Sequence, residues 1–395
     1  MIKRKKKNKE HNPFYDPTLK KRHLSAKRFK KFTLTSLIFS VAFLAFFLFD
    51  MIGKGIPAFN IAYIKVDVTF NEKTLEDTRF AVPTEYRNLV SRAALRDLPK
   101  LLEENPTYMN STQNIWILAS SQVDQYIKNH NHNLKDKDIA IVDELYAQGL
   151  IDKKFNAIFF ENGDSKIPEY AGIFSAVIGS ILTLIITMAV AFPIGVMTAI
   201  YLEEFAGDNK FTRFIEININ NLAAIPSILF GLLGLAIFIN LFGMPRSSPL
   251  VGGLTLALMT LPIIIVSSRA ALRAVPDSIR QAGYGLGLNK IQVTRDHVLP
   301  LAFPGIMTGS IIGLAQAMGE TAPLIIIGMI AFIPDAPSMV TQAATVMPAQ
   351  LFTWAGMPEG MYIEKTAAGI LVLLTILISL NAIAIFLRKK FEVKW

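Results

Sequence analysis

The 395-residue sequence contains no cysteine, and only 18% of its residues are charged. The absence of cysteine excludes a disulfide framework and any zinc site with thiolate ligands. The shortage of charge accompanies a hydrophobic content of 52% and a mean hydropathy of +0.39. Because a large polar minority remains, the apolar residues must be concentrated in blocks, which excludes a single soluble globule.

Most of the positive charge lies in one short segment. The chain has a net charge of +9, whereas residues 1–31 carry thirteen Lys or Arg against Glu10 and Asp16, a surplus of +11. We interpret this segment as a cytoplasmic tail that orients the first membrane span and contacts anionic lipid. Nucleic-acid binding is the weaker alternative, because no aromatic residues are interleaved as in a strand-binding groove.

Six apolar segments can cross a bilayer, whose hydrocarbon core requires about 20 helical residues. They are Phe32–Phe49, Ala171–Leu202, Asn221–Phe242, Leu250–Val266, Gly305–Ile333 and Ala367–Leu387. The sequence therefore predicts an all-α polytopic membrane protein with six transmembrane helices and a small α+β domain between the first two. The predicted parts are a basic tail (1–31), a first transmembrane anchor (32–52), an extracytoplasmic α+β domain (53–170) and a transmembrane domain (171–395).

The distribution of Lys and Arg predicts that both termini are cytoplasmic. In this orientation the inside segments contain 24 basic residues, whereas the short outside loops contain only Arg246 and Lys365. Residues 50–170 contain fourteen more, but long translocated domains escape the rule. A cleaved signal peptide is the alternative for the first span, but its charged region is too long and no small-x-small cleavage site follows.

Residues 53–170 show the patterns of a small folded domain. Apolar and polar residues alternate from Ala62 to Phe70, which predicts a half-buried strand. We also expect a helix capped by Thr84 that carries Leu89, Val90, Ala93 and Ala94, a helix around Ser121–Asn129 and a strand near Phe155–Phe160. On a strand, His130 and His132 could ligate a metal, but their Asn-rich surroundings are more typical of a polar turn, so no metal site is predicted.

Segment 276–300 predicts two helices joined by a sharp turn. Pro276 and Asp277 are typical of a helix start. Apolar or small residues follow at the spacing of one helical face: Ile279, Ala282, Gly283 and Leu286. Gly287 can adopt φ > 0 and end this helix.

The second helix of this segment is expected to begin at Asn289. Gln292 stands three residues later, as in a capping box. We expect Pro300 and Pro304 to stop this helix, because proline lacks the N–H donor that a helix requires. A connector lying along the membrane surface is the alternative for the whole segment.

The spacing within this segment resembles a family motif. Gln281-Ala282-Gly283-x3-Gly287-x9-His297-x-Leu299-Pro300 is similar to the "EAA" loop of ATP-binding-cassette import permeases, Glu-Ala-Ala-x3-Gly-x9-Ile-x-Leu-Pro. The resemblance implies a type I importer permease core, in which the loop is a coupling helix seated in a cleft of a separate ATPase. Gln281, Gly283 and His297 depart from the pattern, and Gln281 removes a charge that the family carries.

The chain has no G-x4-G-K-[ST] phosphate-binding loop. We therefore expect no catalytic residues and no cofactor on this chain, and we place ATP and magnesium on the partner ATPase. The chain is predicted to be a transporter subunit, not an enzyme.

Three further stretches are similar to phosphate permeases. They are Asn221–Gly234, Ala315–Pro323 and Met347–Ala355. Together they resemble the PstA family of permease subunits, in a form with an extra extracytoplasmic region. The resemblance implies inward transport of phosphate across the bacterial inner membrane. It also implies a second permease subunit (PstC-like), an ATPase dimer (PstB-like) and a phosphate-binding protein (PstS-like).

Glu320 is an ionisable residue well inside an apolar segment, which marks it as a functional candidate. Two unit charges 4 Å apart repel by about 4 kcal/mol at an effective dielectric of about 20, so an ionised Glu320 would not bind phosphate directly. A protonated donor, a salt-bridge partner and a hinge strut remain open roles. Thr321 and Pro323 favour a hinge with a restarted half-helix that suits an anion.

Two other features of the spans invite a functional interpretation. Asn221, Pro226 and Ser227 favour an irregularity in the third span, and a plain proline kink is the alternative at Pro226 and at Pro323. Small residues recur every four positions along the fifth span and predict close helix packing, within the chain or against the partner permease. They are Gly305, Gly309, Gly313 and Ala317.

Two alternative functions remain at this stage. A permease for another oxyanion, such as sulfate or molybdate, would keep the coupling loop but need not keep the Gly-Glu-Thr-Ala-Pro stretch. A membrane-anchored sensor would act through residues 53–170 and would have no need of a coupling loop.

Overall fold

The computed structural model describes residues 18–330 and 332–391, so part of the predicted basic tail lies outside the described residues. The chain divides into two compact units, residues 1–53 and 54–395. The first unit holds most of helix α1 (Leu19–Gly55), which contains the predicted first anchor. Its large apolar side chains from Phe32 to Phe49 are mostly exposed, as expected for a helix surrounded by lipid.

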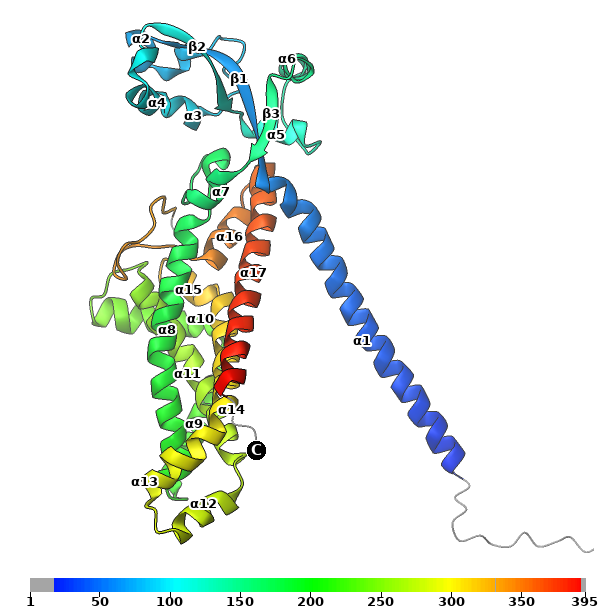
Figure 1. The fold of residues 1–395 in the computed structure, drawn as a ribbon, viewed down its shortest axis with the longest axis vertical. Coiled ribbons are helices and arrows are strands. Elements are labelled where there is room, and N and C mark those ends of the chain that lie inside the picture. The colour runs from blue at the N-terminus through cyan, green and yellow to red at the C-terminus, as the bar shows by residue number, and fades with distance from the viewer. Residues whose placement is uncertain (1–17, 331, 392–395) are drawn as a thin grey trace, which may run out of the picture. The chain divides into compact units, whose positions relative to one another are not determined.

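The second unit begins with a three-stranded antiparallel sheet in the order β2-β1-β3. Its strands are β1 (Asn60–Phe70), β2 (Ser111–Leu118) and β3 (Ile151–Phe155), drawn in Figure 1. The predicted alternation in β1 is confirmed, because the alternate apolar side chains from Ala62 to Phe70 are all buried. The register places Val66 opposite Ile115 and Ile64 opposite Ile151.

Short helices complete this small α+β domain. They are η1 (Ile56–Phe59), α2 (Glu72–Glu76), η2 (Thr78–Ala81), α3 (Arg92–Arg96), α4 (Leu98–Glu104), η3 (Pro106–Tyr108), α5 (Ser121–Ile127), α6 (Asp136–Ala147), α7 (Ala157–Glu161) and η4 (Pro168–Tyr170). The helix predicted around Ser121–Asn129 is confirmed as α5.

Two predictions in this domain are wrong. No helix begins at Thr84: residues 84–89 form turns, and Val90 bridges to Ala119, which holds its backbone extended. A helix begins only where Ser91 caps α3, which carries the predicted Ala93 and Ala94. The strand predicted near Phe155–Phe160 ends at Phe155. The Asn156 side chain accepts a hydrogen bond from the Phe159 N–H at 3.2 Å and thereby starts α7 instead.

The membrane part is mostly helical. Among the described residues, five helices are long and apolar enough to cross a membrane, or six if one bent pair is counted as a span. Besides α1, these helices are α8 (Phe174–Ile200) with its π-helical end η5 (Tyr201–Phe205), α11 (Pro249–Arg273), the run Lys290–Gly319 that contains α14 (Leu299–Gly319), and α17 (Gly360–Phe391). Two short helices, α15 (Ala322–Ile326) and α16 (Met347–Ala355), lie between α14 and α17.

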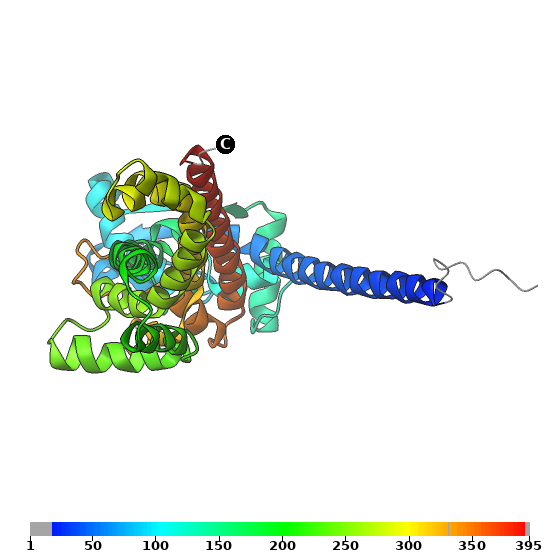
Figure 2. The same cartoon turned by 90° about the horizontal axis from the view of Figure 1, so that it is seen from below.

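The predicted third span is not one straight helix. It is a pair of helical segments, α9 (Lys210–Ala223) and α10 (Ser227–Gly234) with the π-helix η6 (Leu235–Leu241), bent by 103°. Pro226 stands at this bend with extended backbone, where the α9 helix cannot continue through it. Figures 1 and 2 show that α10 and η6 lie across the direction of α8.

The prediction that Pro300 and Pro304 stop a helix is wrong. Helix α13 (Lys290–Val293), the π-helix η7 (Thr294–Val298) and α14 form one continuous run of 30 residues, Lys290–Gly319. The wider π-helical turn lies immediately before Pro300. It shifts the pattern of backbone hydrogen bonds, so that the helix continues although proline has no N–H donor. The fifth apolar helix therefore begins at Lys290 and not at Gly305.

Candidate functional site: a helical elbow and a broken span

Helix α12 (Asp277–Gly285) begins and ends as its sequence predicts. Pro276 precedes it with extended backbone, and Asp277 occupies its first turn. Gly287 has φ of +83°, a conformation that residues with a Cβ adopt at a cost. Asn289 and Gln292 then form a reciprocal capping box with two hydrogen bonds of 2.9 Å. The chain thus turns sharply at Gly287 between two well-defined helix ends. We call this turn with its two flanking helices, α12 and α13, the elbow.

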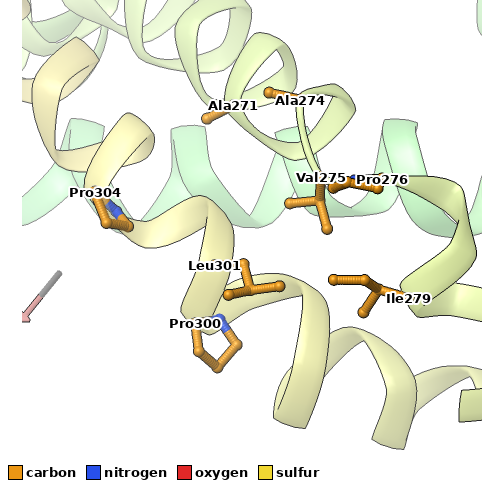
Figure 3. Close-up of a pocket in the computed structure, with 8 residues that line it drawn as sticks. All are labelled: Ala271, Ala274, Val275, Pro276, Ile279, Pro300, Leu301 and Pro304. Carbon is orange, nitrogen blue, oxygen red and sulfur yellow. The ribbon is translucent and has the colours of Figure 1, made fainter. Parts of the chain in front are cut away.

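The inner side of this elbow borders an open pocket of about 380 Å³ that is lined by apolar side chains. In Figure 3, Ile279 of α12 points toward Leu301 of α14 across this space. The pocket is lined by Ala271, Ala274, Val275, Pro276, Ile279, Pro300, Leu301 and Pro304. None of these side chains is polar, so the space offers no charged side chain to a phosphate or a metal.

Gly283 allows α12 to approach α13. A Cβ added at Gly283 would lie 2.8 Å from Cγ2 of Val293, which is too close for two carbon atoms. The family pattern has Ala where this chain has Gly283. The close contact with Val293 explains the difference, because an alanine Cβ would not fit there.

The outer side of the elbow is open. Leu286 is 80% exposed, and Gln281 and Ala282 are exposed beside it. The Gln281 amide donates to Asp277 Oδ2 at 2.8 Å, within the same helix. Leu299 and Pro300 lie on the continuing helix and not at the tip. An exposed Leu next to neutral polar groups suits contact with another protein, and the coupling role of these residues remains a prediction.

The span that begins at this elbow ends in a break. The backbone becomes extended at Glu320, with φ of −74° and ψ of 131°, and α15 starts at Ala322 with Pro323 in its first turn. The structure therefore shows a break and restart at the predicted position. Thr321 stands at the N-cap position of α15 but makes no side-chain capping hydrogen bond among the described residues.

The structure brings together two of the motif stretches that lie far apart in the sequence. A Cβ added at Gly231 of α10 would lie 2.7 Å from Cα of Pro323, so α10 crosses α15 in direct backbone contact. Pro226 and Ser227 start α10, whereas Asn221 is exposed near the end of α9. The bend after α9 thus leads directly into α10, the helix that packs on the short helix α15.

The small residues of α14 face helix α11 of the same chain. Added Cβ atoms would lie 2.6 Å from Ala271 at Gly305 and 2.0 Å from the Ser267 hydroxyl at Gly309. At Gly313 the nearest atom, in Ile264, is 3.5 Å away, and Ala317 is buried. Gly305 and Gly309 therefore permit close packing inside the subunit.

Sequence reasoning missed a buried charged network where the small domain meets α17. Lys365 is 1% exposed, and its ammonium group donates to the carbonyl oxygens of Pro168 and Ala171, each at 2.6 Å. Its neighbour Glu364 contacts Lys128 and His130 of the small domain. The sequence offered one signal of this network, the charged pair Glu364-Lys365 at the start of an apolar helix. It could not identify the partners, which are more than 190 residues away in the sequence.

Three carboxyl groups near this junction have raised pKa values because burial disfavours their charged forms. The pKa of Asp164 is raised to about 6, although the indole N–H of Trp354 donates to it at 2.8 Å and opposes the shift. Burial also raises the pKa of Asp124 and of Glu169. No group of three or more potential metal ligands occurs in the part of the chain that the structure describes, and His130 and His132 lie in a loop.

Comparison with known families accounts for both parts of the chain. Residues 191–393 match the family described as "Binding-protein-dependent transport system inner membrane component". Residues 16–85 and 81–136 match a domain described as of unknown function. This second match covers much of the small α+β domain.

Curated relatives match the membrane part. The chain is 36% identical over 160 residues to the phosphate transport system permease protein PstA of Mycobacterium leprae, a match that covers 40% of this chain and 52% of that protein. It is 31% identical over 245 residues to the PstA protein of Yersinia pestis, covering 61% and 81%. The chain thus spans about half the length of the mycobacterial relatives that it matches.

A solved structure of the MetNI methionine ABC transporter in an inward-facing conformation is also similar. It shares 16% identity and a TM-score of 0.45 over 56% of this chain and 98% of that one. From the family match and the Yersinia pestis relative, the chain belongs to the binding-protein-dependent transport system inner membrane components, and it is a PstA-like ABC permease.

Proposed function

We propose that this chain is the permease subunit of an ATP-driven phosphate importer. It forms half of the transmembrane pathway and receives movement from a separate ATPase at the elbow around α12. The observation that carries this proposal is the continuity of the helical run Lys290–Gly319, which joins the elbow to the break at Glu320. Thirty helical residues extend about 45 Å at 1.5 Å per residue.

This geometry supports a mechanical role. A helix transmits displacement along its length because its backbone hydrogen bonds hold it rigid, whereas the extended Glu320 and the adjoining Thr321, which lie between two helices, can change φ and ψ at little cost. A push on the exposed face near Leu286 would therefore travel through α14 and change the geometry at the break. Figure 1 shows α12 and α15 toward opposite ends of this run.

Phosphate is the substrate that the relatives favour, since the Mycobacterium leprae and Yersinia pestis proteins are named for phosphate transport. The packing of Gly231 against Pro323 supports this choice, because both residues belong to stretches that resemble phosphate permeases. Sulfate or molybdate remains the alternative substrate. The sensor alternative gains no support from the elbow, which a sensor would not require.

The proposed complex contains this chain, a PstC-like permease, a PstB-like ATPase dimer and a PstS-like binding protein. ATP and magnesium would be bound by the ATPase, and this chain would bind no cofactor. Both termini would lie in the cytoplasm, with residues 53–170 on the outside. Glu320 would act as a hinge strut, a protonated donor or a salt-bridge partner, and not as an ionised ligand, because an ionised carboxylate repels phosphate.

The proposal is tested by purifying the complex from its native membrane and identifying every subunit. We expect an ATPase and a second permease, and ATP-dependent uptake of radiolabelled phosphate after reconstitution with the binding protein. Unlabelled sulfate and molybdate serve as competitors. If unlabelled sulfate abolished the uptake and excess unlabelled phosphate left it unchanged, sulfate would replace phosphate as the proposed substrate. A complex without an ATPase would refute the proposal.

A further inference from the structure

A half-buried arginine, Arg280, links helix α12 to two membrane helices. Arg280, in the second turn of α12, donates to Glu204 Oε1 at 2.6 Å and to Glu204 Oε2 at 3.3 Å. Glu204 belongs to η5, the π-helical end of α8. The side chains are 16% and 4% exposed, so water screens this ion pair poorly.

The same guanidinium also binds the end of α11. It donates to the Leu272 carbonyl at 3.0 Å and to the Val275 carbonyl at 2.9 Å. Leu272 lies in the last turn of α11 and Val275 lies just beyond its C-cap, Ala274, and the Leu272 carbonyl also accepts from the Val275 N–H at 3.3 Å. Arg280 therefore joins three segments at one point, namely α12, the end of α8 and the end of α11.

The carboxylate next to Glu204 binds different partners. Glu203 accepts from Arg273 at 2.7 Å and from Arg269 at 3.3 Å, and both arginines lie on α11. Arg269 also contacts Glu216 of α9. Two adjacent acids on α8 thus divide their contacts, with Glu204 directed to the elbow and Glu203 to the membrane helix.

Only arginine can make this set of contacts. Its planar guanidinium directs several donors along fixed directions, whereas the lysine ammonium is a point charge on a flexible stem. A lysine at position 280 would keep the charge near Glu204 but could not also hold both carbonyls of α11. The geometry therefore requires more than charge at this position.

We propose that Arg280 is a positioning residue that transmits the displacement of α12 to α8 and α11. This inference rests on the proposed function, since it assigns a route to the movement that the ATPase delivers. Arg280 is not assigned any contact with phosphate or nucleotide. It acts through Glu204 and the two carbonyls.

The test compares Arg280→Lys, Glu204→Gln and the double variant in the whole reconstituted complex. The first readout is the amount of phosphate taken up per ATP hydrolysed. We expect this ratio to fall on the order of tenfold in each single variant, within the usual range for coupling between sites. The double variant should be no worse than either single one, because both remove the same link.

A second readout does not depend on the substrate. Because the chain contains no cysteine, Gly207→Cys provides a unique thiol on this chain just beyond η5, where an added Cβ has room. The labelling rate of this thiol should change with nucleotide in the otherwise unaltered chain, and Arg280→Lys should abolish that change. Arg213→Lys is the matched control, because its pair with Asp208 is exposed on both sides and should affect neither readout.

Three outcomes would overturn the inference, and a fourth would concern the substrate alone. An unchanged ratio in Arg280→Lys, or additive losses in the double variant, would separate Arg280 from Glu204. Failure of both single variants to assemble would give the pair a purely structural role. A nucleotide-dependent labelling change without phosphate uptake would refute the proposed substrate and leave the labelling experiment to decide on Arg280.

Discussion

Lys128 lies between two buried carboxylates that belong to different parts of the chain. Its ammonium nitrogen is 2.7 Å from Asp124 Oδ2 within α5 and 3.1 Å from Glu364 Oε2 at the start of α17. The Lys128 and Glu364 side chains are each 6% exposed. The small α+β domain is therefore joined to a membrane helix by an ion pair that water scarcely reaches.

Replacing Lys128 with Met should destabilise this junction strongly. Methionine is apolar and only one heavy atom shorter than lysine, so the substitution removes the ammonium group and leaves two carboxylates close together. Removal of one partner of a buried pair costs about 3–5 kcal/mol. The change is measured as the denaturant midpoint of the purified complex, followed by proteolysis of residues 53–170. Lys100→Met is the control, because the Lys100–Asp97 pair is exposed, and equal effects of the two variants would contradict the prediction.

Gly287→Val should uncouple ATP hydrolysis from transport while the complex still assembles. Valine at φ of +83° is strained by about 1–3 kcal/mol, so the turn between α12 and α13 should open or shift. Phosphate uptake per ATP is the measurement. Gly207→Val, in an open loop without positive φ, is the matched control. Normal uptake in Gly287→Val would count against the coupling assignment.

Two substitutions at Glu320 distinguish its possible roles. Glu320→Gln preserves a hydrogen-bond donor of the same size, so phosphate uptake should persist if the carboxyl works protonated and fail if it works as an anion in a salt bridge. Glu320→Ala removes both possibilities and should reduce uptake in either case. Uptake that is normal with alanine would remove Glu320 from the mechanism.

Asp164→Asn should change how stability depends on pH. The folded pKa of Asp164 is about 6 against an ordinary value of 3.8, so the folded state holds this proton more tightly than the unfolded state does. Its contribution to stability is therefore fully present below about pH 4 and is lost as the pH rises to about 6. Asparagine cannot titrate but can still accept from the Trp354 indole.

This variant should show a flatter stability curve across that interval than the unaltered chain. Tryptophan fluorescence during denaturation reports on the site, because Trp354 contacts Asp164 directly. Asp124 and Glu169 titrate in the same direction in both proteins, so the difference between the two curves isolates Asp164. Parallel curves would show that its proton does not affect folding.

Local chemistry determined much of this protein from the sequence alone. Blocks of apolar residues located the long membrane helices, because a helix in lipid must satisfy its own backbone hydrogen bonds over a fixed thickness. The end of α12 at Gly287, the capping box at Asn289 and the alternation in β1 were predictable for the same reason, since each depends on a few neighbouring residues. The Glu320 break was predictable from a proline and a polar residue inside an apolar run.

Only the tertiary structure decided the rest. Pro300 stands inside a continuous helix because a π-helical turn precedes it, and Val90 leaves the helical conformation because Ala119 pairs with it. The contacts of Arg280 with Glu204 and of Lys128 with Glu364 join residues 76 and 236 positions apart. Periodicity and spacing in the sequence carry no information about such partners, because the packing of the helices determines which buried charged residues lie next to each other.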